Sequence, residues 1–276
     1  MIQEIRIKNY LSFRDEVVLS FEATKDTTFE ECQVVNVTPK VRLLRFALIY
    51  GANASGKSNL LNAMDFLRGF WFDKKSDIDE ETGVVPFLLD TETPNEPSEF
   101  NIKFFVGDKR YWYALVLDDK QVIKEDLYVY NSVQPSLVFS RELDGTASLI
   151  KLNASLVKAN ATIVEQLNVK CLSNMSFFAA RNQVNCSLAY IDEVRDWMKN
   201  NMMPIIEPGT RMFEYAGKQM EKNAELKAYI LDFVHKADYN ITDVYTEREK
   251  VPIPDFGKTS IMEDKDIPEK TKERML

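Results

Sequence analysis

The residues best suited to chemistry stand together in one short run. Gly51-Ala52-Asn53-Ala54-Ser55-Gly56-Lys57-Ser58 matches the pattern GxxxxGK[ST] without a gap. In such a loop, small residues let backbone N–H groups converge on phosphate oxygens, and the helix that follows directs its positive end at them. Lys57 would reach the β- and γ-phosphates, and the Ser58 hydroxyl would ligate Mg²⁺. The run predicts a nucleotide-binding site made of Gly51, Ala52, Asn53, Ala54, Ser55, Gly56, Lys57, Ser58 and Asn59.

The segments on either side of the run have the character that such a loop needs. Residues 42–50, RLLRFALIY, are a short apolar run ending at a glycine, which predicts a buried strand of a mainly parallel sheet. After the loop, apolar residues recur with helical spacing, at Leu60, Met64, Leu67 and Trp71. The order strand, glycine loop and helix is the context that supports a phosphate-binding loop.

Hydrolysis of a bound nucleotide also needs an acidic strand that holds magnesium and water. Three places have the apolar-then-acidic form. Residues 118–119 run into Lys120 and a further strand, which favours a hairpin turn. Residues 192–193 are followed by apolar residues at helical spacing, which predicts a solvated helix face. Asp90 follows a proline and too short a run for a central strand. We therefore identify no catalytic residue.

The remaining sequence separates into regions of different texture. Residues 2–7 and 17–21 alternate like an N-terminal hairpin, and five short strands with tight turns between residues 84 and 150 predict an antiparallel meander. Residues 154–236 have helical spacing, with one face at Ile191, Val194, Trp197 and Met198 and another at Leu226, Ile230, Phe233 and Val234. We expect an α/β fold with three parts: a phosphate-loop lobe with the meander (1–153), a helical insertion (154–250) and a polar linker or tail (251–276).

Composition excludes several classes. The chain has 276 residues, 45% of them hydrophobic and 28% charged, which is unlike a disordered or fibrous protein. A net charge of −8 argues against a surface that coats nucleic acid, so a DNA contact would have to be local or shared with a partner. The N-terminus lacks the apolar core of a signal peptide, and no run approaches the roughly 20 apolar residues of a membrane span. We expect a cytoplasmic protein with no membrane association.

Cysteine and histidine give no sign of a metal site. Cys32, Cys171 and Cys186 are far apart and form no CxxC or Cys/His pair, so we interpret them as buried reduced thiols. The one histidine, His235, lies in an apolar helical stretch and is interpreted as a packed or surface residue. A Ras-type GTPase would need NKxD and DxxG, which do not occur, and the arginines after the loop are too scattered for the lid of a small-molecule kinase.

Two segments together resemble a known group of ATPases. Ile5-Arg6-Ile7-Lys8-Asn9-Tyr10-Leu11-Ser12-Phe13, followed some 40 residues later by GANASGKSNLL, is similar to the ABC-type ATPase heads of the SMC, RecF and OLD group. Within it, the chain looks most like bacterial AAA-type ATP-binding proteins related to OLD nucleases, several of which act in anti-phage systems. Later parts of those proteins are similar to the helical stretch from Phe177 to Asn201 and to a β-rich block made of Val85–Asp90, Pro97–Phe100, Tyr111–Tyr113 and Glu125–Tyr128. Ala54 stands where such heads commonly have glycine.

The resemblance implies ATP and Mg²⁺ as cofactors, and a homodimer or second lobe that completes the site, because each loop in such heads needs the signature segment of the other. That segment, the acidic strand and the switch histidine follow the helical insertion in this group, and none is found here. We therefore expect an N-terminal lobe that binds nucleotide with little hydrolysis, and that drives or gates an effector such as a nuclease or toxin. Two alternatives stay open: a complete P-loop kinase acting on a small molecule, and a nucleotide-gated protein-binding module that hydrolyses nothing.

Overall fold

The computed structural model describes residues 1–207, 209–210, 212–237, 239–245, 247 and 262 of the chain. These residues fall into two compact units, the first spanning Met1–Ile205 and the second beginning at Ile206. The division lies inside the stretch 154–250 that the sequence assigns to one helical insertion. Apart from Met262, the predicted tail 251–276 lies outside the described residues.

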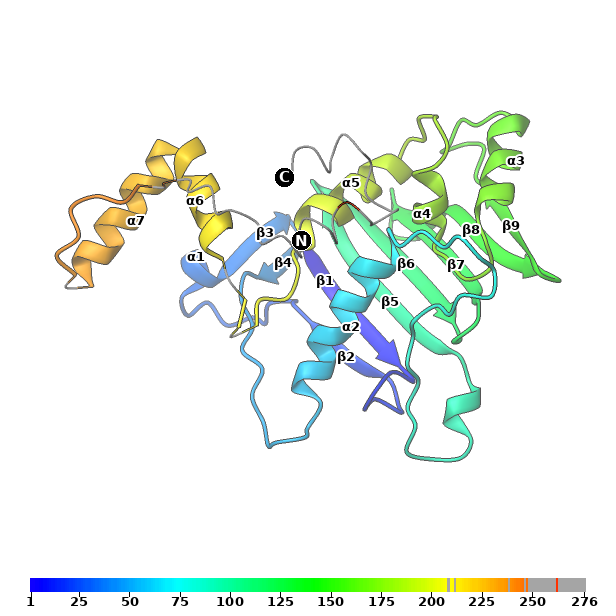
Figure 1. Ribbon diagram of the computed structural model, residues 1–276, viewed down its shortest axis with the longest axis horizontal. Helices are drawn as coiled ribbons and strands as arrows, with labels where there is room; N and C mark the ends of the chain where they lie inside the picture. Colours follow the sequence, from blue (N-terminus) through cyan, green and yellow to red (C-terminus); the bar gives the residue numbers. More distant parts are fainter. Residues whose placement is uncertain (208, 211, 238, 246, 248–261, 263–276) are drawn as a thin grey trace. The chain divides into compact units, whose positions relative to one another are not determined.

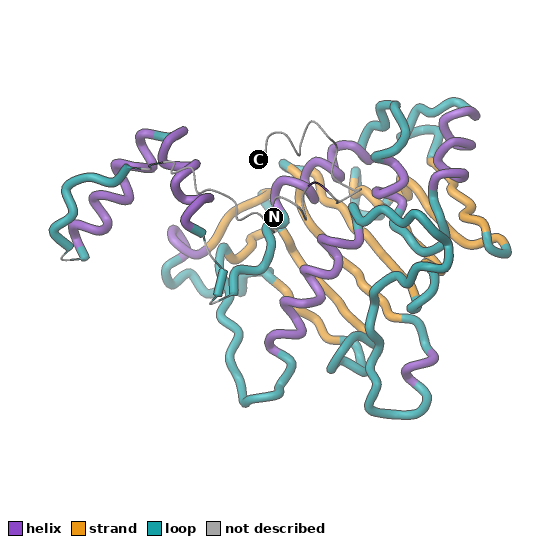
Figure 2. Tube along the Cα trace, viewed as in Figure 1, coloured by secondary structure: helices purple, strands orange, loops and turns teal. Residues whose placement is uncertain are grey.

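The first unit is built on a seven-stranded sheet in which every pair of neighbours is antiparallel (Figures 1 and 2). Five consecutive strands form the predicted meander, and the predicted N-terminal hairpin is also confirmed. The hairpin joins the meander through β1, whose Ile5 pairs with Ile102 of β5. In sheet order the strands are β2 (Val17–Ser20), β1 (Ile2–Lys8), β5 (Ser98–Val106), β6 (Lys109–Leu117), β7 (Val122–Tyr130), β8 (Ser136–Asp144) and β9 (Ala147–Leu152).

Helices α2 (Lys57–Phe70), α4 (Phe177–Arg181) and α5 (Ile191–Asn201) cover one face of this sheet (Figure 1). Apolar side chains alternate along the strands and bury themselves under the helices, as period-two patterning requires. Aromatic pairs connect each helix to the sheet, with ring centroids 4.0–5.2 Å apart: Phe66 with Phe100, Phe177 with Phe139, and Trp197 with Phe104. The α/β fold with an antiparallel meander agrees with the sequence-based fold class.

The other helices are short. α3 (Ala161–Lys170) lies against β9, and its first turn is capped by the Asn160 side chain, which accepts a hydrogen bond from Ile163 N. In the second unit, α6 (Phe213–Lys222) and α7 (Ala224–Lys236) contact each other. The predicted apolar face of α5 is buried, whereas the four residues of the predicted apolar face of α7 are half-buried or exposed. No helix of the described residues is long and apolar enough to cross a membrane.

The prediction of a buried parallel strand over residues 42–50 is wrong. Strand β4 ends at Leu44 (Val41–Leu44) and pairs antiparallel with β3 (Val34–Thr38), which follows the one-turn helix α1 (Glu30–Gln33). Among the described residues, no strand pairs with positions 45–50, and Phe46, Leu48 and Tyr50 are 67, 76 and 91% exposed. An apolar run becomes a buried strand only where neighbouring strands flank it. None does so here, and residues 46–50 form an exposed apolar segment.

Candidate functional site

The loop at the start of α2 has the backbone that the glycine-rich pattern predicts. Residues 51–55 form bends and turns on the surface, and Lys57 is the first helical residue. Gly56 occupies the N-cap position with φ of 87°, in the left-handed region that glycine enters without strain. Ala54 also has positive φ, at 61°, which explains why glycine would suit this position better. Two left-handed residues in one short loop curl its backbone before the helix begins.

Space as well as conformation requires glycine at position 56. A Cβ built there would lie 2.8 Å from the Phe13 ring atom Cε1 and 3.0 Å from Ser12 Oγ. Contacts this short do not occur between ordinary Cβ atoms and their neighbours. Gly51 is less restricted, because its Cβ would meet only Ser55, at 3.1 Å. The loop is therefore seated closely on the turn between β1 and β2.

The Lys57 side chain folds back across the loop. Its Nζ donates hydrogen bonds to the carbonyl oxygens of Gly51, at 3.0 Å, and Ala52, at 2.6 Å. These two residues begin the loop and Lys57 ends it, so the ammonium group lies beside the curled backbone. A lysine ammonium in this place can exchange carbonyl oxygens for phosphate oxygens, because it has three donors on a flexible stem.

The remaining predicted residues are close together on the first turn of α2 and the loop. Ser58 is exposed, and its hydroxyl is free of any hydrogen bond within the part of the chain that the structure describes. Asn53 and Ser55 are also exposed. Asn59 differs, because its Nδ2 donates to Ser12 Oγ at 2.8 Å and so attaches the helix to the β1–β2 turn. Asn59 thus has a structural contact, whereas Ser58 is available to a ligand.

Residues that the motif did not identify support the loop from below. Asn9 is fully buried, donates from Nδ2 to the carbonyls of Thr93 and Glu96, and accepts at Oδ1 from Phe87 N. Tyr10 packs between Phe66 of α2 and the sheet residue Phe100, and burial, followed by the nearby Asp65, raises the pKa of its phenol to about 12. The segments 9–13 and 85–97, distant in sequence, are joined through Asn9, and the first of them also contacts the loop at Gly56. Their resemblance to the ATPase group was the signal that marked both.

All three acidic candidates make contacts that stabilise other parts of the unit, and the sequence indicates this for two of them. Asp118 accepts backbone hydrogen bonds from Lys120 and Gln121 in the β6–β7 turn, so the predicted hairpin is confirmed. Asp90 accepts from the backbone of Glu92 and Thr93 and caps the 3₁₀ turn η1 (Thr93–Asn95). Both carboxylates are therefore engaged in turns.

The prediction for residues 192–193 needs a correction. Both lie in the first turn of α5, as expected, but not on a solvated face. Asp192 contacts the buried Arg181 at 2.8 Å, and Glu193 pairs with Lys109 at 2.8 Å. These carboxylates attach α5 to the rest of the unit. In the described residues, no group of three or more histidine, cysteine, aspartate or glutamate side chains could hold a metal ion.

The cysteines are free, but one of them is exposed, contrary to expectation. Cys32 lies at the surface in α1, whereas Cys186 is half-buried and Cys171 is buried. Burial raises the pKa of the Cys171 thiol to about 11, so this thiol stays protonated and unreactive near neutral pH. His235 is exposed in the last turn of α7, in accord with its interpretation as a packed or surface residue.

One comparison with known protein families gives a match that includes this site. Residues 46–151 match the model of a family described as "AAA domain, putative AbiEii toxin, Type IV TA system". The match begins in the exposed apolar segment and continues through the loop, α2 and the meander. It supports a nucleotide-binding P-loop ATPase domain of the AAA type in this part of the chain. No curated protein and no solved structure matches the chain.

Proposed function

We propose that this chain binds ATP with Mg²⁺ and acts as one lobe of an ABC-type ATPase that gates or powers an effector protein. The observation that carries the proposal is the close-seated loop before α2, in which Gly56 is left-handed, residues 51–55 are exposed and Lys57 reaches back over the backbone. A Cβ at Gly56 would collide with Phe13 and Ser12, so this position is restricted to glycine, as in the small-residue loops that hold phosphate groups.

The residues fit the chemistry of a nucleoside triphosphate. Backbone N–H groups of residues 51–56 and the positive end of α2 would hold the phosphates. Lys57 would contact the terminal phosphates. The Ser58 hydroxyl, which makes no hydrogen bond in the described part of the chain, would ligate Mg²⁺. The missing NKxD motif and the resemblance to ABC-type heads favour ATP over GTP.

The exposed apolar segment 46–50 supports completion by another polypeptide. It leads directly into the loop, and three of its side chains are more than half exposed. Strands supplied by a second lobe or subunit would cover these side chains and could bring the acidic residues that this site lacks. We propose a homodimer or a complementary lobe as the first partner.

Two similarities indicate the biological process in which the proposed activity takes part. The matched family's description names a toxin and a toxin–antitoxin system, and the OLD-like resemblance points to anti-phage or DNA-related processes. We therefore propose an effector such as a nuclease or toxin, in the cytoplasm. A DNA contact has less support, because the chain carries a net charge of −8.

Replacement of Lys57 by alanine tests nucleotide binding. We expect Lys57→Ala to weaken Mg²⁺–ATP binding about 10- to 100-fold, because a charge-assisted hydrogen bond contributes roughly 1.5–3 kcal/mol. Isothermal titration calorimetry with and without Mg²⁺ measures this, and Ser58→Ala should reduce the enhancement by Mg²⁺. Lys40→Ala, at an exposed turn between β3 and β4, is the matched control and should bind as the unaltered chain does. Equal affinity of Lys57→Ala and the unaltered chain would exclude the site.

Turnover is a separate expectation. Since Asp90, Asp118 and Asp192 are engaged in a turn, a hairpin and an ion pair, the purified chain should release phosphate from ATP no faster than Lys57→Ala does. Steady hydrolysis by the unaltered chain that Lys57→Ala abolishes would contradict this, and would mean that one of the acidic residues completes the site. A protein partner captured equally well by the chain and by Lys57→Ala would instead favour the binding module that hydrolyses nothing.

A further inference from the structure

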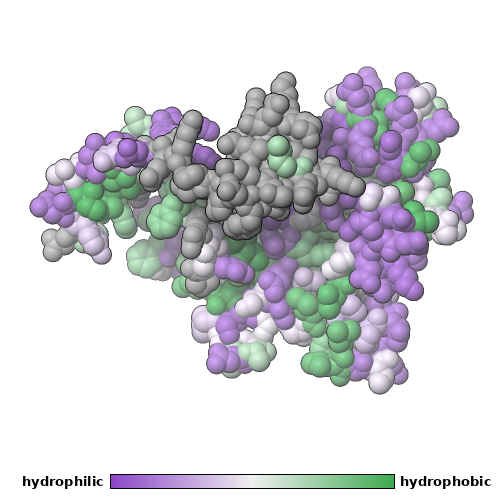
Figure 3. All heavy atoms as spheres, in the orientation of Figure 1, coloured by the Kyte–Doolittle hydropathy of each residue, from purple (hydrophilic) through white to green (hydrophobic). Residues whose placement is uncertain are grey.

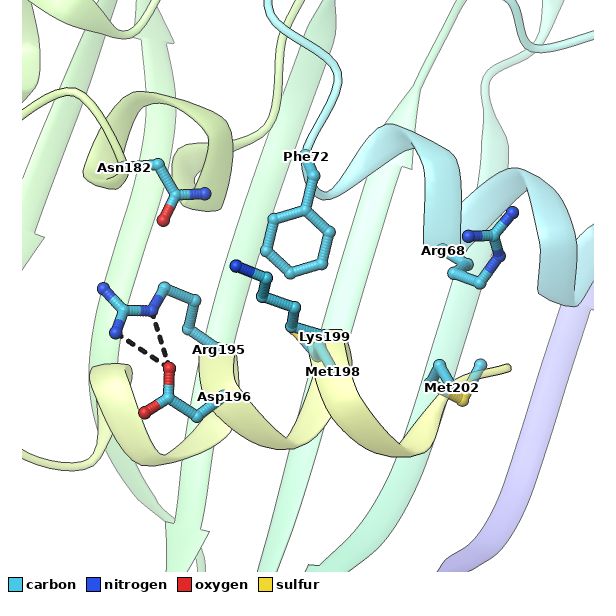
Figure 4. Close-up of a pocket in the computed structure, with 8 residues that line it drawn as sticks. All are labelled: Arg68, Phe72, Asn182, Arg195, Asp196, Met198, Lys199 and Met202. Atoms are coloured by element: carbon cyan, nitrogen blue, oxygen red, sulfur yellow. Dashed lines mark hydrogen bonds and ion pairs between the residues drawn. The ribbon is translucent and has the colours of Figure 1, made fainter. Parts of the chain in front are cut away.

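A cavity lies at the opposite end of α2 from the loop. It has a volume of about 580 Å³ and is bounded by the last turn of α2 and the residue Phe72 beyond it, by Asn182 after α4, and by α5 (Figure 4). α2 has 14 residues, so its ends are separated by roughly 20 Å at 1.5 Å per residue. The cavity is therefore separate from the proposed nucleotide site.

Positive charge gathers at this cavity. Arg68, Arg195 and Lys199 line it, together with a single carboxylate, Asp196, in a chain whose net charge is −8. Arg195 and Lys199 are four residues apart on α5, and like charges at that spacing repel each other. A cavity lined by several cations attracts an anionic ligand, even in an acidic protein.

The partners of these cations differ. Arg68 contacts Asp65 at 3.1 Å, and Arg195 contacts both Asp196, at 2.8 Å, and Asp192, at 3.5 Å. Within the described residues, Lys199 has no ion pair, and Figure 4 shows its side chain extending toward Phe72 and Asn182. Cations in the last turns of α2 and α5 favour the negative ends of those helices. That effect applies to Arg68 and Lys199, but not to Arg195 in the middle of α5, and it does not explain why the Lys199 ammonium lies at the cavity without an ion pair in the described residues.

The rest of the lining is apolar. The Phe72 ring borders the cavity (Figure 4), and so do Met198 of α5 and Met202 just beyond it, which are 0 and 9% exposed. Methionine sulfur and an aromatic ring make favourable contacts with a flat organic group. The volume lies within the 300–1,000 Å³ typical of small-molecule sites.

We infer that this cavity binds a small phosphomonoester that carries a planar aromatic group. Guanidinium groups and an ammonium supply charged donors for the phosphate, with Arg giving the bidentate geometry. Phe72, Met198 and Met202 contact the planar part, and the Asn182 amide offers one donor and one acceptor to its polar edge. The inference does not depend on the proposed nucleotide site, because it uses none of residues 51–59.

A titration with 1-naphthyl phosphate tests the site. By isothermal titration calorimetry the unaltered chain should bind with a Kd of about 1 mM or tighter. Inorganic phosphate and 1-naphthol, which each lack one half of the probe, should bind at least about tenfold more weakly, a difference of ~1.4 kcal/mol. Lys199→Met should weaken the probe at least about tenfold, and it removes no ion pair that the described structure contains. Arg195→Met should also weaken it, with folding checked by thermal denaturation.

Two control variants make the outcome decisive. Lys170→Met removes an exposed lysine from the last turn of α3 and should leave the affinity unchanged. Lys57→Ala should also leave it unchanged. Absence of binding, affinity that survives Lys199→Met, or affinity lost on Lys57→Ala would each overturn the inference, the last because the probe would then occupy the loop at the other end of α2.

Discussion

Replacement of Arg141 by methionine is expected to lower the free energy of unfolding by about 3–5 kcal/mol, because it leaves a buried carboxylate without its cation. Arg141 and Glu125 are both fully buried, with Nη1 and Oε2 3.2 Å apart. Denaturation by urea, followed by circular dichroism of the sheet, measures the loss. Since a typical domain has only about 5–15 kcal/mol of stability, this is the largest effect we expect from a single change.

The contacts of Arg141 explain why its loss should be so costly. Besides Glu125, its guanidinium donates to Ser148 Oγ and to the carbonyls of Leu172, Ser173 and Met175. It thereby attaches the segment before α4 to strands β7 and β8. Lysine has three donors without a planar fork, so Arg141→Lys should recover part of the stability and provide a folded variant for comparison.

The carboxylate side of the network is equally occupied. Glu125 accepts hydrogen bonds from the Tyr113 hydroxyl, the Ser176 hydroxyl and Phe177 N. Burial, and then the charge of Glu125, raises the pKa of Tyr113 well above its ordinary value, which keeps this phenol protonated as a donor. Arg14→Met, which breaks an exposed pair with Asp15, is the control and should leave the urea midpoint almost unchanged, because exposed ion pairs contribute little to stability. Similar losses for Arg14→Met and Arg141→Met would contradict the argument.

Replacement of Gly56 by alanine should abolish most of the nucleotide affinity, because keeping the loop in its present conformation would then cost about 2–5 kcal/mol. The left-handed backbone, at φ of 87°, costs an L-residue roughly 1–2 kcal/mol. The new methyl group would lie 2.8 Å from Phe13 Cε1, and overpacking of this kind costs about 1–3 kcal/mol. Ala54 shows that the chain tolerates positive φ in this loop, so the contact with Phe13 decides the result.

Two further variants separate these causes. Gly69→Ala changes a glycine of the same helix whose Cβ would meet nothing within 4 Å, and it should leave affinity intact while adding about 0.5–1 kcal/mol of stability. Phe13→Ala combined with Gly56→Ala removes the ring atoms from the contact. The double variant should therefore bind ATP more tightly than Gly56→Ala alone, as calorimetry would measure. Unchanged affinity in Gly56→Ala would show that the loop is not closely seated on the turn.

Much of the site could be predicted because the residues that specify it are close together in the sequence. Two glycines, a lysine and a serine at fixed spacing identify residues 51–58, and apolar spacing identifies α2 after them. The conformation of Gly56 follows from its position at the N-cap of that helix. The meander was predictable for the same reason, since turns such as Asp118–Gln121 bond within themselves. The contacts of the supporting residues Asn9 and Ser12 were not, because their partners are 47–87 residues away in sequence.

By itself, then, the sequence determined the short-range features: the loop, the helix that follows it, the strands of the meander and the hairpin turns between them. Tertiary structure decided which strands neighbour each other, so that β1 joins β5, and left residues 46–50 exposed although their composition is that of a buried strand. It also decided the pairing of Arg141 with Glu125 and the gathering of three cations beside Phe72. The physical reason is that burial and charge pairing depend on which distant residues come together, whereas turn and helix propensities act between near neighbours along the chain.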